Sequence, residues 1–261
     1  MTEFSGRADP DRILPLLWRH AAPSRTANPA AGRPARLTVD AVVAAGIAIA
    51  DAEGLAATSM ARVAAALNVG TMTLYTYAPS RAELVDLMVD EVLVRHPLPT
   101  PGDPRPAGWR AQVELYDERT RAMYEAHPWL SEVSTIRPPI GPGMLADREY
   151  VLSTVAGLGL PPAQVDAAAL AIVSLVTSAA RNAAEDIHVV RGTGQSTDAW
   201  WDRRGRLWEE YFDVERHPTM TRLWNEGAFV HSAADQAARG HAFGLGALLD
   251  GIEATALRAT R

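Results

Sequence analysis

The sequence predicts an all-α protein in which an N-terminal helix-turn-helix head precedes a larger helical domain. Apolar residues recur at helical spacing through most of the chain, and no period-2 alternation bounded by hairpin turns is visible. Two short helical patterns meet at a tight turn near Asn68. Prolines cluster between residues 97 and 104, after these helices in the sequence. We therefore expect a flexible arm at residues 1–36, the head at 37–95 and the larger helical domain at 96–261.

Composition narrows the class of protein. The chain has 261 residues, of which 48% are hydrophobic and 21% charged, as in an ordinary globular protein. Cysteine is absent, which excludes disulfides and thiolate metal sites and fits a reducing cytoplasm. No signal-peptide pattern is visible, and the longest uncharged apolar run, between Asp166 and Arg181, is too short to cross a bilayer. We expect a cytoplasmic protein with no membrane partner.

Net charge bears on the kind of partner. The formal net charge is −6 at pH 7, which counts against a protein that coats nucleic acid in general. It does not exclude a specific DNA binder, because the charge close to the duplex matters more than the total.

Residues 1–36 form the expected flexible arm. Pro10 and Pro15 limit the one apolar turn that this segment could form. Residues 21–36 consist largely of Ala, Pro, Gly and Arg, a composition typical of linkers. Arginines such as Arg33 could instead enter a minor groove, because narrow minor grooves attract them. The sequence leaves both interpretations open.

Four helices are predicted in the head. Thr38 fits the N-cap of the first helix, and Gly54 is a typical C-terminal signal. Ser80 opens the fourth helix, and Glu83 three residues later completes a capping box. In order, the helices are expected between Thr38 and Gly54, at 59–67, at 70–77 and from 80 onward.

The larger domain is also predicted to be helical. Its candidate helices lie at 109–126, 144–157, 161–190, 198–213, 217–225 and 236–259. The loop at Arg137–Gly143 and the region Gly192–Gly194 are expected to break them.

The turn at Asn68 and the helix after it suit contact with a DNA major groove. Two short helices that pack at a steep angle let the second one protrude. Small residues are needed where the helices touch, and Ala61, Ala64 and Ala65 are small. Asn tolerates the positive φ of such a turn better than other non-glycine residues. The second helix then offers hydroxyl and methyl groups that can reach base edges and phosphates.

The stretch from Leu37 to about Leu93 resembles the DNA-binding head of the TetR family along its length and without gaps. The matching pattern is LTVDAVVAAGIAIADAEGLAATSM, followed by VAAALNVGTMTLYTYAPSRAELVDLM. The resemblance implies DNA contacts at the matching positions, which are Ser59, Thr71, Met72, Thr73, Tyr75, Thr76, Tyr77 and Arg81. Residues 71–73 would face bases, residues 75–77 phosphates or bases, and Ser59 and Arg81 phosphates. It also implies a homodimer on double-stranded operator DNA.

The sequence departs from the family pattern at a few positions. Asn68 stands where the family usually has glycine, Tyr77 replaces a common histidine, and Ala78 replaces a bulkier apolar residue. The predicted recognition helix has no Arg, Lys, Asn or Gln, so it cannot make bidentate contacts with guanine or adenine. We therefore expect methyl and hydroxyl contacts and an operator with key thymines. Tyr75 or Tyr77 could alternatively pack inward.

Aromatic and methionine side chains in the larger domain suit an internal cavity for a small apolar effector. Such a cavity needs apolar walls and a few polar groups. The candidate ligand-binding residues are Trp109, Tyr116, Met123, His127, Trp129, Arg137, Met144, Asn182 and Trp208. His127, Arg137 or Asn182 could orient the ligand. Ordinary core packing is the alternative for these side chains.

No catalytic or metal-binding pattern is found in the sequence. The seven histidines are scattered, and no H-x-x-x-H pair occurs. The glycine pairs at 157–159 and 244–246 lack a preceding strand and a third glycine at phosphate-loop spacing. We expect no catalytic residues, no metal and no cofactor.

The predicted helices at 161–190 and 236–259 are the expected dimer interface, because one head reads only about half of a two-fold site. We expect a repressor whose heads fit successive major grooves. A ligand would release it by shifting the helix at 109–126, so that the heads move out of register. A regulator that activates, or that needs a co-repressor, shares this pattern, and an all-α enzyme is a further alternative.

Overall fold

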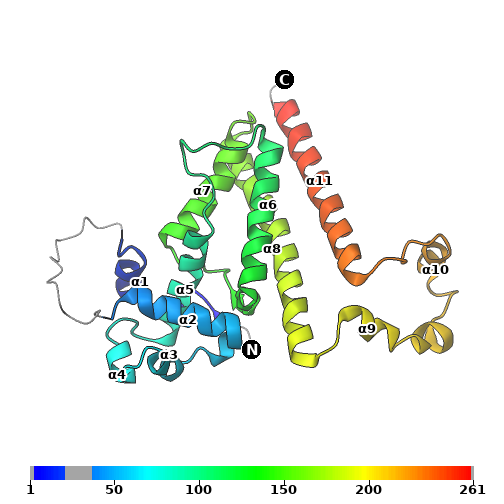
Figure 1. Ribbon diagram of the computed structural model, residues 1–261. Helices are drawn as coiled ribbons and strands as arrows, with labels where there is room; N and C mark the ends of the chain where they lie inside the picture. The colour runs from blue at the N-terminus through cyan, green and yellow to red at the C-terminus, as the bar shows by residue number, and fades with distance from the viewer. Residues whose placement is uncertain (1–2, 21–36, 260–261) are drawn as a thin grey trace.

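The computed structural model describes residues 3–20 and 37–259, and helices dominate them, which confirms the all-α prediction. The head consists of α2 (Val39–Glu53), the 3-10 turn η1 (Leu55–Ala57), α3 (Met60–Ala66), α4 (Thr71–Leu74) and α5 (Arg81–Arg95). The body consists mainly of α6 (Trp109–Ala126), α7 (Pro142–Ala156), α8 (Pro162–Thr193) and α11 (Ala233–Ala259). Figure 1 shows the head beneath the long body helices.

The head helices begin at the capping residues that the sequence indicates. The side chains of Thr38, Ser59 and Ser80 each accept a hydrogen bond at 3.1 Å from an N–H of the first helical turn. Gly54 ends α2 with φ 87°, a conformation that favours glycine. Helix α4 ends at Leu74, earlier than expected, and the chain then continues as turns.

Residues 3–20 are ordered, which corrects the expectation of a flexible arm for this part of the chain. Glu3–Phe4 form strand β1, which pairs in parallel with β2 (Val133–Ser134), and Pro10–Leu17 form α1. Pro10 lies in the first turn of α1, where a missing N–H breaks no helical hydrogen bond. Ile13 and Leu17 are buried in the head core, so this segment has apolar anchors. Residues 21–36, including Arg33, lie outside the described residues.

The body helices differ from expectation at two places. Helix α8 runs through Gly192 and ends only at Gly194, whose φ is 67°. The helix expected at 198–213 is divided into α9 (Thr197–Asp202) and a π-helical turn η3 (Leu207–Tyr211), with Gly205 in the turn between them. Helix α10 (Pro218–Asn225) then precedes α11.

Helices α9 and α10 lie beside the body, away from α6 and α7 (Figure 1). None of the residues in α9, η3 and α10 is buried. Their aromatic rings nevertheless contact one another, and Trp208 lies 6.3 Å from Trp201 and 5.5 Å from Trp224 between ring centroids. This aromatic group therefore forms a small packed unit outside the main core.

The buried side chains form two separate apolar clusters. The first, which we call the head cluster, joins the head to the nearby ends of α6 and α8 and includes Met88, Trp129 and Ala180. The second, the body cluster, holds α6, α7, α8 and α11 together and includes Tyr150, Ile172 and Leu249. The head is thus packed directly against the body through apolar contacts.

Candidate nucleic-acid interface and its links to the body

The helix-turn-helix is formed by α3 and α4. Asn68 has φ 54° and is the only non-glycine residue with positive φ in the described part of the chain. The N–H of Val69 donates to the carbonyl of Ala64 at 3.0 Å, which closes the turn. Leu74 and Ala78 are fully buried and anchor α4 from one side. Ala64 is buried as expected, but Ala61 and Ala65 are exposed, so only one of these alanines lies in the contact.

Most of the predicted DNA-binding side chains face solvent. Ser59, Met72, Thr73, Tyr75 and Thr76 are exposed, whereas Thr71 and Tyr77 are half-buried. Met72 is 79% exposed, an unusual state for a large apolar side chain in a protein without a partner. Tyr77 is partly buried and packs against the head cluster, so its side chain is turned partly inward, as the alternative prediction states. Helix α4 therefore presents hydroxyl and methyl groups outward.

Arg81 has several intramolecular partners. Its Nε donates to the carbonyl of Thr58, and Nη2 donates to that of Leu55, each at 3.0 Å. Its Nη1 forms an ion pair with Glu3 of β1. These bonds hold the turn before α3 against α5, and a phosphate contact would have to use the remaining N–H groups or displace Glu3.

The first polar link between head and body is made by Asp51 of α2. Its Oδ1 accepts hydrogen bonds from Nδ1 of His127 and from Nε1 of Trp129, both at 2.7 Å. His127 follows the last turn of α6, and Trp129 lies in the 3-10 turn η2 (Pro128–Glu132). The end of α6 is therefore bonded directly to a helix of the head.

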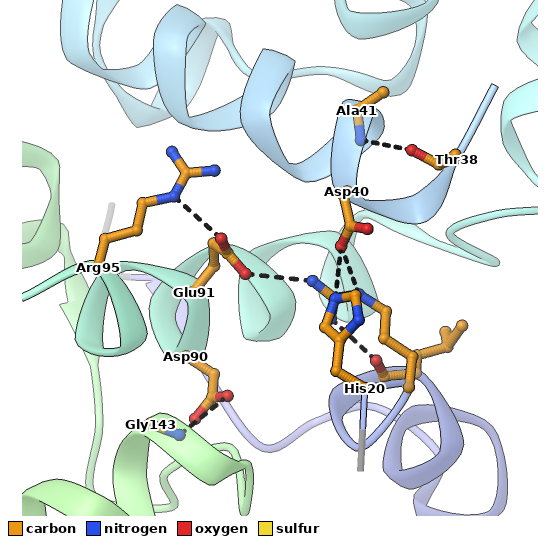
Figure 2. Close-up of polar contacts among 10 residues, drawn as sticks. His20, Thr38, Asp40, Ala41, Asp90, Glu91, Arg95 and Gly143 are labelled. Atoms are coloured by element: carbon orange, nitrogen blue, oxygen red, sulfur yellow. Dashed lines mark hydrogen bonds and ion pairs between the residues drawn. The ribbon is translucent and has the colours of Figure 1, made fainter. Parts of the chain in front are cut away.

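The second link is made by Asp90 of α5, which caps the first turn of α7. Its carboxylate accepts a hydrogen bond from the N–H of Met144 at 2.9 Å. It accepts another from the N–H of Gly143 at 3.3 Å, which Figure 2 shows. Burial raises the pKa of Asp90, while these two hydrogen bonds oppose the shift. A Cβ atom at Gly143 would lie 2.5 Å from the main-chain oxygen of Asp90, so glycine permits the close approach of α5 and α7.

The ordered N-terminal segment, residues 3–20, makes the third link. Ser5 Oγ lies 2.9 Å from the carbonyl oxygens of Ser134 and Arg137 in the body. The N–H of Gly6 donates to Asp86 of α5 at 2.9 Å, and Nε1 of Trp18 donates to the carbonyl of Ile140 at 2.9 Å. This segment thus touches both parts of the molecule.

Arg19, near the end of this segment, forms a small charge network with the head. Its Nε donates to Asp40 of α2 at 2.7 Å, and its Nη2 donates to Glu91 of α5 at 3.1 Å. Figure 2 shows that His20 is also hydrogen-bonded to Asp40 and that Arg95 is also hydrogen-bonded to Glu91. The network ties α2 and α5 to the N-terminal segment.

The buried carboxyl of Asp86 makes stability depend on pH. Burial raises its pKa to about 6, although the Gly6 N–H opposes the shift. Because this folded-state pKa lies above the usual value, the contribution of Asp86 is greatest in acid and is lost as pH rises through about 6. We expect Asp86→Asn, which keeps an acceptor for Gly6, to gain stability relative to the wild type between pH 4 and pH 7. Urea unfolding at both pH values measures this.

Asp40→Asn is the matched control for that measurement. The hydrogen bonds and charges of Arg19 and His20 outweigh burial and lower the pKa of Asp40. Asp40→Asn should therefore lose stability relative to the wild type as pH rises through the acid range. This change is opposite in sign to the one expected for Asp86→Asn. Equal curves for Asp86→Asn and the wild type would contradict the role assigned to the Asp86 charge.

The structure distributes the nine predicted ligand-binding residues over separate places. Tyr116 and Met123 are buried on α6, and Trp109 and Met144 are half-buried. His127 and Trp129 lie at the Asp51 link, and Trp208 lies in the aromatic group beside the body. Arg137 and Asn182 are exposed. The structure does not bring the nine together around one cavity.

Sequence reasoning missed several charged residues that the structure buries or partly buries. They are Asp51, Asp86, Asp90, Asp117, Asp147 and His241. Asp86 and Asp90 stand four residues apart within the otherwise apolar run LVDLMVD, which was the available signal. The others become visible only when distant helices meet. Within residues 3–20 and 37–259, no group of three His, Asp or Glu residues could hold a metal ion.

Two family models match the sequence. The model described as "Bacterial regulatory proteins, tetR family" matches residues 42–88, which cover most of α2 to α5. The model described as "Tetracyclin repressor-like, C-terminal domain" matches residues 100–256, which cover α6 to most of α11. Together they span the head and the body.

Individual proteins are similar over nearly the whole chain. The HTH-type transcriptional repressor DrrR1 of Streptomyces coeruleorubidus is 38% identical over 253 residues, which are 97% of this chain and 88% of that protein. The crystal structure of the TetR family protein ActR of Streptomyces coelicolor with actinorhodin has a TM-score of 0.69 and 28% identity, and the match covers 85% of this chain and 99% of that one. The structure of ActR with (S)-DNPA has a TM-score of 0.67 and 27% identity, and covers 85% and 100%.

Proposed function

Because the chain belongs to the TetR family of bacterial regulators, we propose that it is a dimeric transcriptional repressor that a small effector releases from operator DNA. The observation that carries the proposal is the outward face of α4, where Met72, Thr73, Tyr75 and Thr76 are exposed while Leu74 anchors the helix. Such a helix can enter a major groove. The similarity to the repressor DrrR1 favours repression over activation.

Base recognition in this proposal depends on methyl and hydroxyl groups. Residues 70–77 contain no Arg, Lys, Asn or Gln, so bidentate contacts with guanine or adenine are not available from α4. We expect thymines to dominate the operator, and replacing a contacted thymine by uracil to weaken binding by about 1 kcal/mol or more per site. Footprinting followed by uracil substitution measures this. A guanine-dominated site without thymine dependence would contradict the expectation.

We propose that a second copy of the chain binds to the outer faces of α8 and α11 and so forms the dimer. The uncharged run between Asp166 and Arg181 is too short to cross a bilayer, but the whole of helix α8 is long and apolar enough by length and composition alone. Only 22% of its apolar 18-residue window is buried. A groove between the two helices is lined by small and apolar residues, among them Ala168, Ala247 and Gly251. Small residues let helices approach closely, as a four-helix interface requires. A membrane is the alternative occupant of an apolar face of this kind.

The dimer can be tested at Phe243, which is 80% exposed on α11. We expect Phe243→Glu to weaken self-association by at least about tenfold, because it places a charge in an apolar interface. Analytical ultracentrifugation measures the change, and circular dichroism should show an intact helical fold. Leu257→Glu, at a residue near the C-terminal end of α11, tests how far along the helix the interface extends. A wild-type monomer at micromolar concentration would refute the interface.

Effector release is the remaining part of the proposal. ActR binds actinorhodin and (S)-DNPA in its crystal structures, so these two molecules are the first probes. A hundredfold loss of operator affinity requires a coupling free energy of about 2.7 kcal/mol between the two sites. The test is a gel shift with operator DNA, with and without each probe and at several salt concentrations. Tighter DNA binding with the probe would instead identify a co-repressor-dependent regulator.

We infer a cytoplasmic location from this function, because operator DNA is there. An enzymatic role has no specific observation in its favour.

A further inference from the structure

Charge is distributed unevenly along the head. Residues 37–95 contain seven carboxylates but only three arginines, which are Arg62, Arg81 and Arg95. Between Glu53 and Arg81 the chain has a single charged side chain, that of Arg62. A DNA-binding surface needs cations close to the phosphates, because contacts with phosphates supply the part of the affinity that does not depend on sequence. The helix-turn-helix therefore has one arginine of its own for this task.

Arg62 lies on the outer face of α3. Ser59 and Ala66, three and four residues away, share this face, and all three residues are exposed. Val63 and Ala64 are buried and form the inner face. Figure 1 shows α3 and α4 on the side of the head that faces away from the body helices. In a helix-turn-helix the second helix enters the major groove while the first crosses the backbone, so the outer face of α3 is placed to meet phosphates.

Arg62 forms an ion pair with a carboxylate of the neighbouring helix. Its Nη2 donates to Oε1 of Glu53, the last residue of α2, at 2.6 Å. The side chains of Arg62 and Glu53 are 45% and 42% exposed, so water and salt reach the pair. Ion pairs with this exposure stabilise a folded protein little. Stability alone is therefore a weak reason for the pair.

The other two arginines of the head are held differently. Arg81 donates to two main-chain carbonyl groups and pairs with Glu3. Arg95 pairs with Glu91 on α5, outside the helix-turn-helix. Within residues 3–20 and 37–259, the guanidinium of Arg62 has one hydrogen-bond partner, Glu53. Arg62 can therefore turn toward a phosphate by breaking one exposed contact.

We propose that Arg62 binds a phosphate of the operator backbone and that Glu53 competes with this phosphate for the guanidinium. This inference rests on the proposed function. When the head docks, the guanidinium exchanges a carboxylate oxygen for phosphate oxygens, which it can bond through two N–H groups at once. The carboxylate of Glu53 stays close to the contact and repels the backbone.

The competition has a consequence for the search for an operator. It weakens the contact with phosphate, which is the same on every sequence, and leaves the contacts of α4 with bases untouched. Non-operator DNA greatly outnumbers operators in a genome and holds a DNA-binding protein through phosphates. Weaker binding to phosphates therefore leaves more of the protein free to reach its operator.

Two duplexes of about 30 base pairs are the probes, a length that accommodates two heads one helical turn apart. One is the DNA that flanks the gene of this protein, and the other is a shuffled sequence of the same composition. Fluorescence anisotropy gives the dissociation constant at several salt concentrations. The slope of its logarithm against the logarithm of salt concentration counts the phosphate contacts. A melting curve for each variant measures stability.

We expect Arg62→Ala to weaken binding to both duplexes by at least about tenfold and to lower the salt slope by about 1 for each head. Arg62→Lys keeps the charge but loses the forked geometry, so its affinity should be intermediate and its slope close to that of the wild type. Both variants should melt near the wild-type temperature, because the pair is exposed. An unchanged salt slope in Arg62→Ala overturns the inference.

Glu53→Gln separates competition from a structural link between α2 and α3. It removes the negative charge at nearly constant volume, so we expect the affinity for both duplexes to rise several-fold. A pair that only joined the two helices would give a lower or unchanged affinity, and either result overturns the role of Glu53. In the Arg62→Ala background the same substitution should have a smaller effect, because both residues act on one contact. An equal effect in both backgrounds contradicts competition for Arg62.

Arg222→Ala and Glu226→Gln are the matched controls. Arg222 and Glu226 form another exposed arginine–glutamate pair, on α10, with side chains 63% and 57% exposed. The two substitutions change the total charge by the same amounts as Arg62→Ala and Glu53→Gln do. We expect wild-type affinities and salt slopes from both. Effects as large as those at residues 62 and 53 would show that only net charge matters, which overturns the inference.

The two duplexes separate this test from the test of the proposed function. If the wild type binds both equally, the proposed function is contradicted, while the salt slopes still decide the role of Arg62. If the wild type prefers the flanking DNA and Arg62→Ala behaves like it, only the phosphate contact is refuted. A wild type that binds neither duplex refutes both proposals.

Discussion

Replacing Asp90 by Ala is expected to destabilise the protein by about 2–4 kcal/mol, because it leaves one buried and one partly buried N–H group without an acceptor. These are the N–H groups of Gly143 and Met144 in the first turn of α7. The substitution also opens a small void between α5 and α7, where Gly143 allows close packing. Urea unfolding followed by circular dichroism measures the change.

Asp103→Ala is the matched control for this prediction. Asp103 also accepts a hydrogen bond from a main-chain N–H, that of Thr100 at 2.8 Å, but the contact is exposed. Water replaces the lost acceptor there, so the change in stability should be below about 0.5 kcal/mol. Asp90→Asn, which keeps one acceptor oxygen, should fall between the two. Equal effects at residues 90 and 103 would show that burial of the α7 cap is unimportant.

Trp129→Ala is expected to cost about 3–5 kcal/mol, the usual effect of removing a large buried aromatic side chain. Trp129 is 1% exposed and lies in the head cluster. The substitution also removes the hydrogen bond from Nε1 to Asp51, which joins η2 to the head. Trp224→Ala, at an exposed residue of α10, provides the comparison and should have a small effect on the melting temperature.

Trp129→Phe separates packing from the hydrogen bond. It fills most of the same space but cannot donate to Asp51, so we expect a milder loss of about 1–2 kcal/mol. If the Asp51 link carries the effector signal, this variant binds the probes normally yet releases operator less completely. If Trp129 instead contacts the effector, its probe affinity falls. Calorimetry and gel shifts on the same variant distinguish the two roles.

The head could be predicted closely from sequence because its signals are local. Thr38, Ser59 and Ser80 cap helices within their own first turns, and Asn68 meets the steric demand of one tight turn. The sequence predicts that the short helix after Asn68 faces outward. Leu74 is buried on one side of this helix, so the opposite side is exposed. Its assignment as a DNA contact surface remains a prediction.

The links between head and body could not be predicted in this way. Asp51 and Trp129 are 78 residues apart in sequence, and Asp90 and Gly143 are 53 apart. Periodicity indicates which face of a helix is apolar, but it does not identify the helix that will cover that face. For the same reason the sequence predicts one ligand set from the aromatic residues of the body, whereas Trp208 packs with other rings outside the core.

The prolines of the N-terminal segment led to a different error. Pro10 and Pro15 are interpreted from the sequence as limits on order, yet Pro10 stands in the first turn of α1, where proline is compatible with a helix, and α1 also accommodates Pro15 in its interior. Ile13 and Leu17 then supply the apolar contacts that hold the helix in position. Burial on another element, rather than local propensity, determined the structure of this segment.

The contacts of β1 have a practical consequence for anyone who purifies this protein. Glu3 pairs with Arg81, and β1 hydrogen-bonds to β2, so residues 3 and 4 lie between the head and the body. An affinity tag inserted next to β1 would crowd this contact between head and body. A tag fused behind α11 avoids it, and comparing operator affinity between the two fusion proteins is a sound first step before any titration.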